Sequence, residues 1–187
     1  VSVAPREGDE RYNFENDDLG FVDTESGALL KIGMSSEDVE KLIGAPRTVD
    51  RDGFRIYSGI VIKYDDNGNA SQMIVAAGNM EGDDNPNRFV SPRGVKLSTT
   101  LDEFKSVYGD EYNEPSQAAE GDESIKSSAM MAVRYYAKNG DTFNYLGGSY
   151  TKENKPENDA DLIMQTFLFS TETKTVSVMS VGNGTAN

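Results

Sequence analysis

Apolar residues recur at helical spacing in two short stretches of the chain. Their members are Val39, Leu42 and Ile43 in the first stretch and Leu101, Phe104, Val107 and Tyr108 in the second. Each stretch follows a residue that commonly caps a helix, Ser35 or Thr100, and each stops at a glycine, Gly44 or Gly109. Because helices this short are not stable alone, the pattern predicts that both pack on a sheet.

Apolar and polar residues alternate elsewhere, which is typical of antiparallel strands with one buried face. The alternation predicts strands over 54–57, 60–64, 71–77, 131–136, 143–145, 162–169 and 173–181. Two sharp turns are expected, at 66–69 and at Asn139-Gly140, because Asn and Gly accept positive φ readily. Each predicted helix is therefore followed by its own set of antiparallel strands.

The two halves align when Gly44 is set on Gly109, an offset of 65 residues. At that offset Val39 meets Phe104, and the helix caps also coincide. We therefore predict an α+β fold of two tandem helix-plus-antiparallel-meander units, with the helices packed on one face of the sheet.

Composition along the chain suggests where these units begin and end. Residues 1–20 are polar and acidic, and we interpret them as a flexible tail. The first repeat unit is placed at 21–91 and the second at 92–187. Residues 78–94 contain three glycines and two prolines and are interpreted as the linker between the units.

The segment Leu30–Pro46 combines a Gly33-Met34-Ser35 opening, a short helix and a Gly44-Ala45-Pro46 ending. Together with the strands that follow, it resembles the β-lactamase-inhibitor-protein and outer-membrane small-lipoprotein superfamily. The resemblance covers 22–77 well and 93–182 more loosely. It implies a tandem repeat of this unit, with binding through an open and concave sheet face.

The chain also departs from that family. The inhibitor proteins have a disulfide in each unit, whereas this sequence has no cysteine. The second half has Ser98-Thr99 in place of the Gly-Met pair, and no proline directly follows Gly109. No inhibitory contact residue matches a position here, so the resemblance implies a fold and a binding role but no target.

The 187 residues carry a formal net charge of −14, which opposes binding to nucleic acid and to anionic lipid surfaces. Membrane insertion is not expected, because the longest purely apolar run, Met73–Ala77, is far shorter than the roughly 20 residues that span a bilayer. The chain begins at Val1 and continues with an acidic leader. Either a signal segment was removed or the sequence is trimmed at this end. The acidic leader suits a tether, and we expect an extracytoplasmic protein, secreted or tethered to the cell envelope.

The absence of both cysteine and histidine excludes thiolate catalysis and every Ser-His arrangement. Ser149 and Lys152 fit the Ser-x-x-Lys spacing of penicillin-recognising enzymes, and Lys174-Thr175-Val176 resembles their Lys-Thr-Gly. That chemistry requires the serine at the start of a buried helix. Here the motif lies beside Gly147-Gly148 in a polar stretch, which favours a solvated loop, so no catalytic residue is predicted.

Oxygen-bearing side chains alternate over Asp65–Asn69, as they do at the start of calcium loops. The sixth and twelfth positions are Ala70 and Ala76, however, so we favour a hairpin tip. The acidic stretches 83–85 and 159–161 are interpreted as solvated loops, with calcium binding as the alternative. We expect neither a metal site nor a cofactor.

The remaining candidate is a surface, on the sheet face opposite the helices. By alternation, its members are Arg55, Tyr57, Lys63, Arg134, Tyr136, Asn144 and Gln165. Tyrosine and arginine are favoured anchors of protein interfaces, whereas an ordinary solvated sheet face is the alternative.

These observations favour a non-enzymatic protein-binding module, secreted or tethered to a bacterial cell envelope, with a protein partner on the open sheet face. A protein inhibitor of a serine hydrolase, such as a β-lactamase, is the second hypothesis. A small carboxylate-dependent hydrolase is the third. The sequence does not indicate an oligomeric state.

Overall fold

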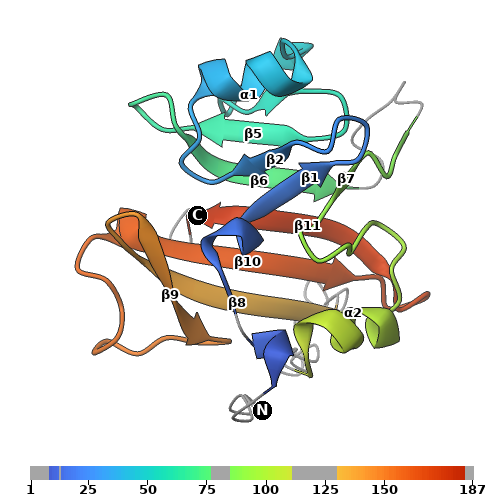
Figure 1. Cartoon of the computed structure of the whole chain (residues 1–187), viewed down its shortest axis with the longest axis vertical. Coiled ribbons are helices and arrows are strands. Elements are labelled where there is room, and N and C mark those ends of the chain that lie inside the picture. Colours follow the sequence, from blue (N-terminus) through green and yellow to red (C-terminus); the bar gives the residue numbers. More distant parts are fainter. Residues whose placement is uncertain (1–8, 13, 77–84, 111–129, 184–187) are drawn as a thin grey trace, which may run out of the picture.

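The computed structural model describes residues 9–12, 14–76, 85–110 and 130–183 (Figure 1). The α-helices within these ranges are α1 (Ser36–Ile43) and α2 (Leu101–Tyr108). The short 3-10 helices are η1 (Glu10–Tyr12), η2 (Asn16–Asp18) and η4 (Asp159–Asp161). The strands are β1 (Gly20–Asp23), β2 (Leu29–Lys31), β3 (Thr48–Val49), β4 (Arg55–Ile56), β5 (Val61–Tyr64), β6 (Ala70–Ala76), β7 (Phe89–Val90), β8 (Met130–Asn139), β9 (Thr142–Gly147), β10 (Leu162–Phe169) and β11 (Val176–Asn183).

Eight of the described strands form one antiparallel sheet, in the order β3-β4-β5-β6-β11-β10-β8-β9 (Figure 1). The two halves of the chain join where β6 pairs with β11, with Val75 opposite Met179. Gly182 lies opposite Gln72 at this junction, and a Cβ on Gly182 would lie 2.8 Å from the Cα of Gln72. The glycine therefore allows the close approach through which the sheet continues from one half to the other.

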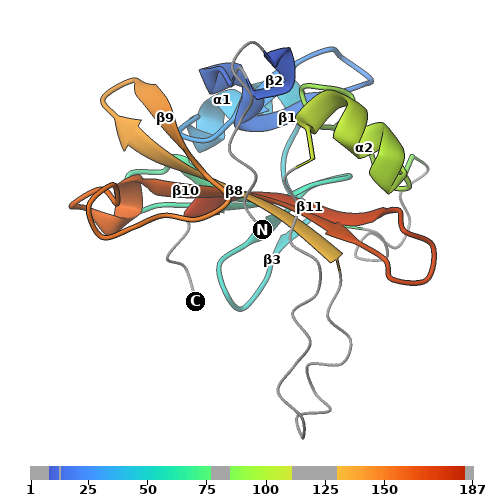
Figure 2. The ribbon, with the colours of Figure 1, turned by 90° about the horizontal axis from the view of Figure 1, so that it is seen from below.

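A second layer covers one face of this sheet. It contains the three-stranded sheet β2-β1-β7 and both α-helices, all of which lie on the same side in Figure 2. We call this side of the eight-stranded sheet the inner face and the opposite side the outward face.

The predicted α+β fold of two tandem helix-plus-meander units is wrong. The described chain is mostly antiparallel β-structure in two sheets, with only two short helices. Strand order also differs between the halves, because β3 to β6 are sequential neighbours whereas β9 lies outside β8 in the order β9-β8-β10-β11. Moreover, β7 arises within the predicted linker and pairs with β1. Alternation identifies strands, but it does not specify which strand edges pair.

Both helices occur where the spacing predicts them. The Ser35 hydroxyl accepts a hydrogen bond from the Asp38 amide, and Thr100 and Glu103 form a reciprocal capping box. Val39 and Phe104 are both 0% exposed, which confirms their assignment to the packed face of each helix. Leu42, assigned to the same face, is 43% exposed, so that assignment is wrong.

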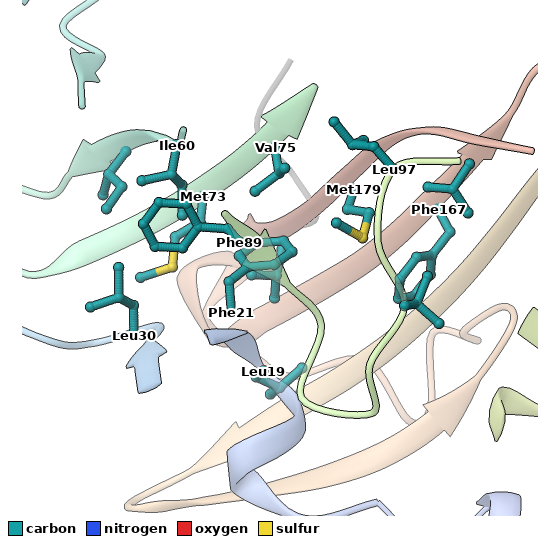
Figure 3. Close-up of a cluster of buried hydrophobic side chains, with 14 of the residues drawn as sticks. Leu19, Phe21, Leu30, Ile60, Met73, Val75, Phe89, Leu97, Phe167 and Met179 are labelled. Atoms are coloured by element: carbon teal, nitrogen blue, oxygen red, sulfur yellow. The ribbon is translucent and has the colours of Figure 1, made fainter. Parts of the chain in front are cut away.

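The principal core lies between the two layers (Figure 3). Phe21, Leu30 and Phe89 from the small sheet point towards the inner face of the large sheet. There they meet buried side chains of both halves, namely Ile60, Met73, Val75 and Met179. One core therefore connects the halves of the chain, as does the shared sheet.

Residues 14–19 are packed against the rest of the chain, although they belong to the predicted flexible tail, 1–20. Residues 1–8 and 13 of that tail lie outside the described ranges. Phe14 lies with its ring centroid 4.3 Å from that of Tyr145, and Leu19 is 1% exposed. Asp18 forms an ion pair with Arg93, with Oδ1 2.9 Å from Nε. The acidic residues here are therefore partly neutralised by specific partners, so acidity alone did not indicate a solvated tail.

Candidate binding face

The structure divides the seven predicted surface residues between the two sides of the sheet. Lys63 and Asn144 are exposed on the outward face. Their neighbours in the chain, Ile62 beside Lys63 and Phe143 and Tyr145 beside Asn144, pack towards the core. The other five are on the inner face: Arg55, Tyr57, Arg134, Tyr136 and Gln165. The prediction of an exposed surface is wrong for four of them, which are at most 3% exposed: Tyr57, Arg134, Tyr136 and Gln165. The Arg55 side chain is 35% exposed and pairs with Glu40 on the inner side. Alternation separates two sets of residues but does not say which set is covered.

Tyr57 and Arg55 hold α1 against the sheet. The Tyr57 hydroxyl donates to Glu40 Oε1 at 3.1 Å and shares a 2.8 Å hydrogen bond with the Tyr64 hydroxyl. Arg55 Nη1 donates to the same Glu40 oxygen at 3.0 Å, and its guanidinium lies 4.7 Å from the Tyr64 ring centroid. Burial raises the pKa of both tyrosines, so their phenols stay protonated and the cluster is structural.

Arg134 is 0% exposed and is surrounded by aromatic rings. Its guanidinium carbon lies 5.0 Å from the ring centroid of Tyr108, 5.4 Å from that of Phe104 and 5.5 Å from that of Phe14. Nη2 donates to the Tyr108 carbonyl oxygen. Nε and Nη1 have no acceptor among the described residues, so the rings provide much of the compensation for this buried charge.

Tyr136 and Gln165 continue this internal network towards the N-terminal segment. The Tyr136 hydroxyl donates to Gln165 Oε1 at 3.2 Å, and Gln165 Nε2 donates to the Asp18 carbonyl at 3.0 Å. Burial raises the pKa of Tyr136 well above its usual value. The polar residues that were predicted to anchor a partner therefore hydrogen-bond the sheet to the segments that cover it.

The outward face is predominantly apolar instead. One row of cross-strand neighbours runs over it from β8 to β4: Val133, Thr166, Ser180, Ile74, Val61 and Ile56. A parallel row contains Met131, Leu168, Val178 and Ala76. Most of these apolar side chains are only partly buried. The sequence analysis named none of these residues as members of the open face, because it searched that face for tyrosine, arginine and other polar side chains.

The outward face is hollowed at its β3–β4 end. A pocket of about 370 Å³ is lined by Asp50, Asp52, Phe54, Ile56, Val61 and Ile74. Its floor is the β4–β6 part of the apolar row, and its rim is the β3–β4 turn, which projects from this face in Figure 2. The size lies within the range of about 300–1,000 Å³ that is common for ligand sites.

Hydrogen bonds within the β3–β4 turn stabilise the rim of the pocket. Asp50 Oδ1 accepts from the amides of Asp52 and Phe54, both at 2.9 Å, and the Asp50 amide donates to the Phe54 carbonyl. Lys63 Nζ lies 5.4 Å from the Phe54 ring centroid. The sequence analysis missed this pocket. The residues Asp50-Arg51-Asp52-Gly53 are typical of a turn, but a turn alone does not reveal a pocket.

The other sequence motifs form no site in the described residues. Ser149 and Lys152 are exposed and lie outside any helix, so the Ser-x-x-Lys spacing lacks the required context. Asp65 Oδ1 accepts from the amides of Asn67 and Asn69, as in an ordinary hairpin turn. Asp159 pairs with Lys155. Residues 83 and 84 lie outside the described ranges, and within those ranges no three acidic residues are grouped as metal ligands.

Comparisons of the chain with family models, with curated proteins and with solved structures found no match. The family resemblance seen in Leu30–Pro46 therefore stays a hypothesis that depends on those residues. None of the helices in the described part of the chain is both long enough and apolar enough to cross a membrane.

Proposed function

We propose that this protein is a non-enzymatic binding module that holds a protein partner on the outward face of its eight-stranded sheet. The observation that carries the proposal is the partly exposed apolar surface formed by the two cross-strand rows. Contiguous apolar surface of this kind typically marks an interaction site in a water-soluble domain. Among the described residues, both helices and the small sheet lie against the opposite face (Figure 2).

Charge supports a partner with a basic surface. The chain has 32 acidic and 18 basic residues, and two of its carboxylates form the rim of the pocket on this face. A partner that combines aliphatic side chains with lysine or arginine would match both the rows and the rim. An acidic partner would instead be repelled.

The chemistry of the chain favours binding over catalysis. Histidine and cysteine do not occur in the sequence, and the buried tyrosines with raised pKa are held in structural hydrogen bonds. An extracytoplasmic setting belongs to the same proposal and is supported by the resemblance of Leu30–Pro46 to envelope and secreted binding proteins.

Peptide selection tests the proposed face. A displayed library of random dodecapeptides is selected on the folded chain, and the binders are then measured against Val178→Lys and Leu168→Lys. Both changes place a charge on the outward face beyond the pocket. We expect each to weaken binding about tenfold or more. Leu42→Lys on α1 is the matched control, since Leu42 is already exposed, and should change affinity less than twofold.

Two results would overturn the proposal. Selected peptides that bind both outward-face variants normally would place the site elsewhere. Alternatively, sedimentation could show self-association that Val178→Lys abolishes, which would assign the outward face to a second copy of the chain.

A further inference from the structure

We infer that the pocket at the β3–β4 end of the outward face binds a lysine or arginine side chain of the partner. This inference rests on the proposed function and adds the chemical class of the anchoring residue. It follows from the combination of an apolar floor with two carboxylates at one edge of the same cavity.

The floor suits the aliphatic stem of a basic side chain. Ile56, Val61 and Ile74 are direct cross-strand neighbours, so their side chains form a continuous apolar strip. The Phe54 ring provides the wall. Long basic side chains commonly lay their methylene groups on such surfaces while the charged end stays at the polar edge.

The rim suits the charged end. Asp50 uses Oδ1 within its turn, and among the described residues no hydrogen bond or ion pair involves its Oδ2 or the carboxylate of Asp52. Both groups therefore have acceptor capacity for an ammonium or guanidinium ion. The Lys63 ammonium already lies 5.4 Å from the Phe54 ring centroid, so we expect the charged end of the ligand at the two aspartates and not at this ring.

Among the described residues, no basic side chain of the chain itself is paired with Asp50 or Asp52. Within the described residues, no ion pair links Lys63 to Asp50 or Asp52, and Lys63 lies against Phe54 instead. A metal ion fits less well, because calcium prefers six to eight oxygen ligands and most of this lining is hydrocarbon.

A short peptide series tests the inference directly. The probes are acetyl-Val-Thr-X-Thr-Val-amide, with X as lysine, arginine, norleucine or glutamate, titrated into the ¹⁵N-labelled full chain. We expect saturable shifts of the Phe54 and Ile74 amides with lysine and arginine. Norleucine has a similar apolar stem without the charge and should bind at least about threefold more weakly. Glutamate should cause no such shifts.

A matched pair of double variants separates the pocket from overall charge. Asp50→Asn with Asp52→Asn should weaken the lysine peptide about fivefold and remove most of its salt dependence. Asp65→Asn with Asp66→Asn removes the same charge from the β5–β6 turn, where Asp65 makes equivalent turn hydrogen bonds. This control should bind the lysine peptide within twofold of the unmodified chain.

The outcomes distinguish this inference from the proposed function. If lysine and norleucine peptides bind equally, or if both double variants behave alike, the inference is wrong while the outward-face proposal can still hold. The lysine peptide could require Asp50 and Asp52 while the selected library peptides bind Val178→Lys and Leu168→Lys with unchanged affinity. In that case the inference about the pocket is supported, and the proposal that the wider outward face binds a partner is wrong. Shifts of the same amides by micromolar calcium chloride alone would make the pocket a cation site and overturn the inference.

Discussion

At the level of single residues, the least expected feature is a buried guanidinium that has no carboxylate partner among the described residues. Arg134 has two nitrogen positions with no acceptor among the described residues, whereas Arg93 nearby is paired with Asp18. The two arginines share the rings of Phe14 and Tyr108. They therefore allow a comparison of a buried cation with and without a counter-charge.

Replacing Arg134 with methionine should leave the free energy of unfolding unchanged or raise it by about 1–3 kcal/mol. The change keeps much of the side-chain volume and removes the desolvation cost of an incompletely compensated charge. Arg93→Met should instead lower the free energy of unfolding by about 2–4 kcal/mol, because it leaves Asp18 without its partner. Urea denaturation measures both. A loss above about 1 kcal/mol in Arg134→Met would show that the aromatic contacts outweigh desolvation.

At the scale of elements, the two helices depend on one or two buried side chains each. Phe104 contacts the rings of Tyr108, Phe167 and Phe169, with centroid distances of 5.1, 4.9 and 5.2 Å. Local capping defines where α2 begins and ends, but this aromatic cluster attaches the helix to β10. In α1 the corresponding contact is made by Val39, since Leu42 faces solvent.

Phe104→Ala should therefore lower the free energy of unfolding by about 3–5 kcal/mol, the usual range for a buried phenylalanine. Leu42→Ala is the matched change on α1 and should cost less than about 1 kcal/mol, because the leucine is 43% exposed. Both values come from chemical denaturation followed by circular dichroism. Similar losses in the two variants would mean that Leu42 is covered in solution.

At the scale of the whole molecule, one sheet and one core connect both halves of the chain. The pairing of β6 with β11 continues the ladder, and Met73 and Met179 belong to the same buried cluster. The buried tyrosines are distributed over both halves, with Tyr57 in the first and Tyr108 and Tyr136 in the second. Their ionisation therefore reports on whether the halves unfold together.

Raising the pH should unfold the halves in one step. Burial raises the pKa of Tyr108 to about 12, and burial also raises the pKa values of Tyr57 and Tyr136. The stability linked to their protonated phenols is thus fully present below about pH 10, where free tyrosine titrates, and is lost as the pH rises above it. Absorbance at 295 nm and near-ultraviolet circular dichroism should change together.

Tyr108→Phe is the control for this titration. It removes one phenol that donates to Ser91 Oγ at 2.9 Å, and it should make the loss of stability above about pH 10 less steep. Two separate transitions in absorbance would show that the halves unfold independently, despite the shared sheet.

Elements that are held by local hydrogen bonds could be predicted from the amino-acid sequence. Ser35 and Thr100 each accept a hydrogen bond from the amide three residues further along the chain, and the hairpin turn at Asp65–Asn69 spans five residues. Both features could therefore be predicted from residues that are close in sequence. The side of each strand that is covered, by contrast, depends on contacts between segments far apart in the chain. Gln165 is buried because its amide reaches the Asp18 carbonyl, 147 positions away in the chain. The pocket likewise depends on the register of β4, β5 and β6, and long-range strand pairing is not encoded in a local pattern of polarity.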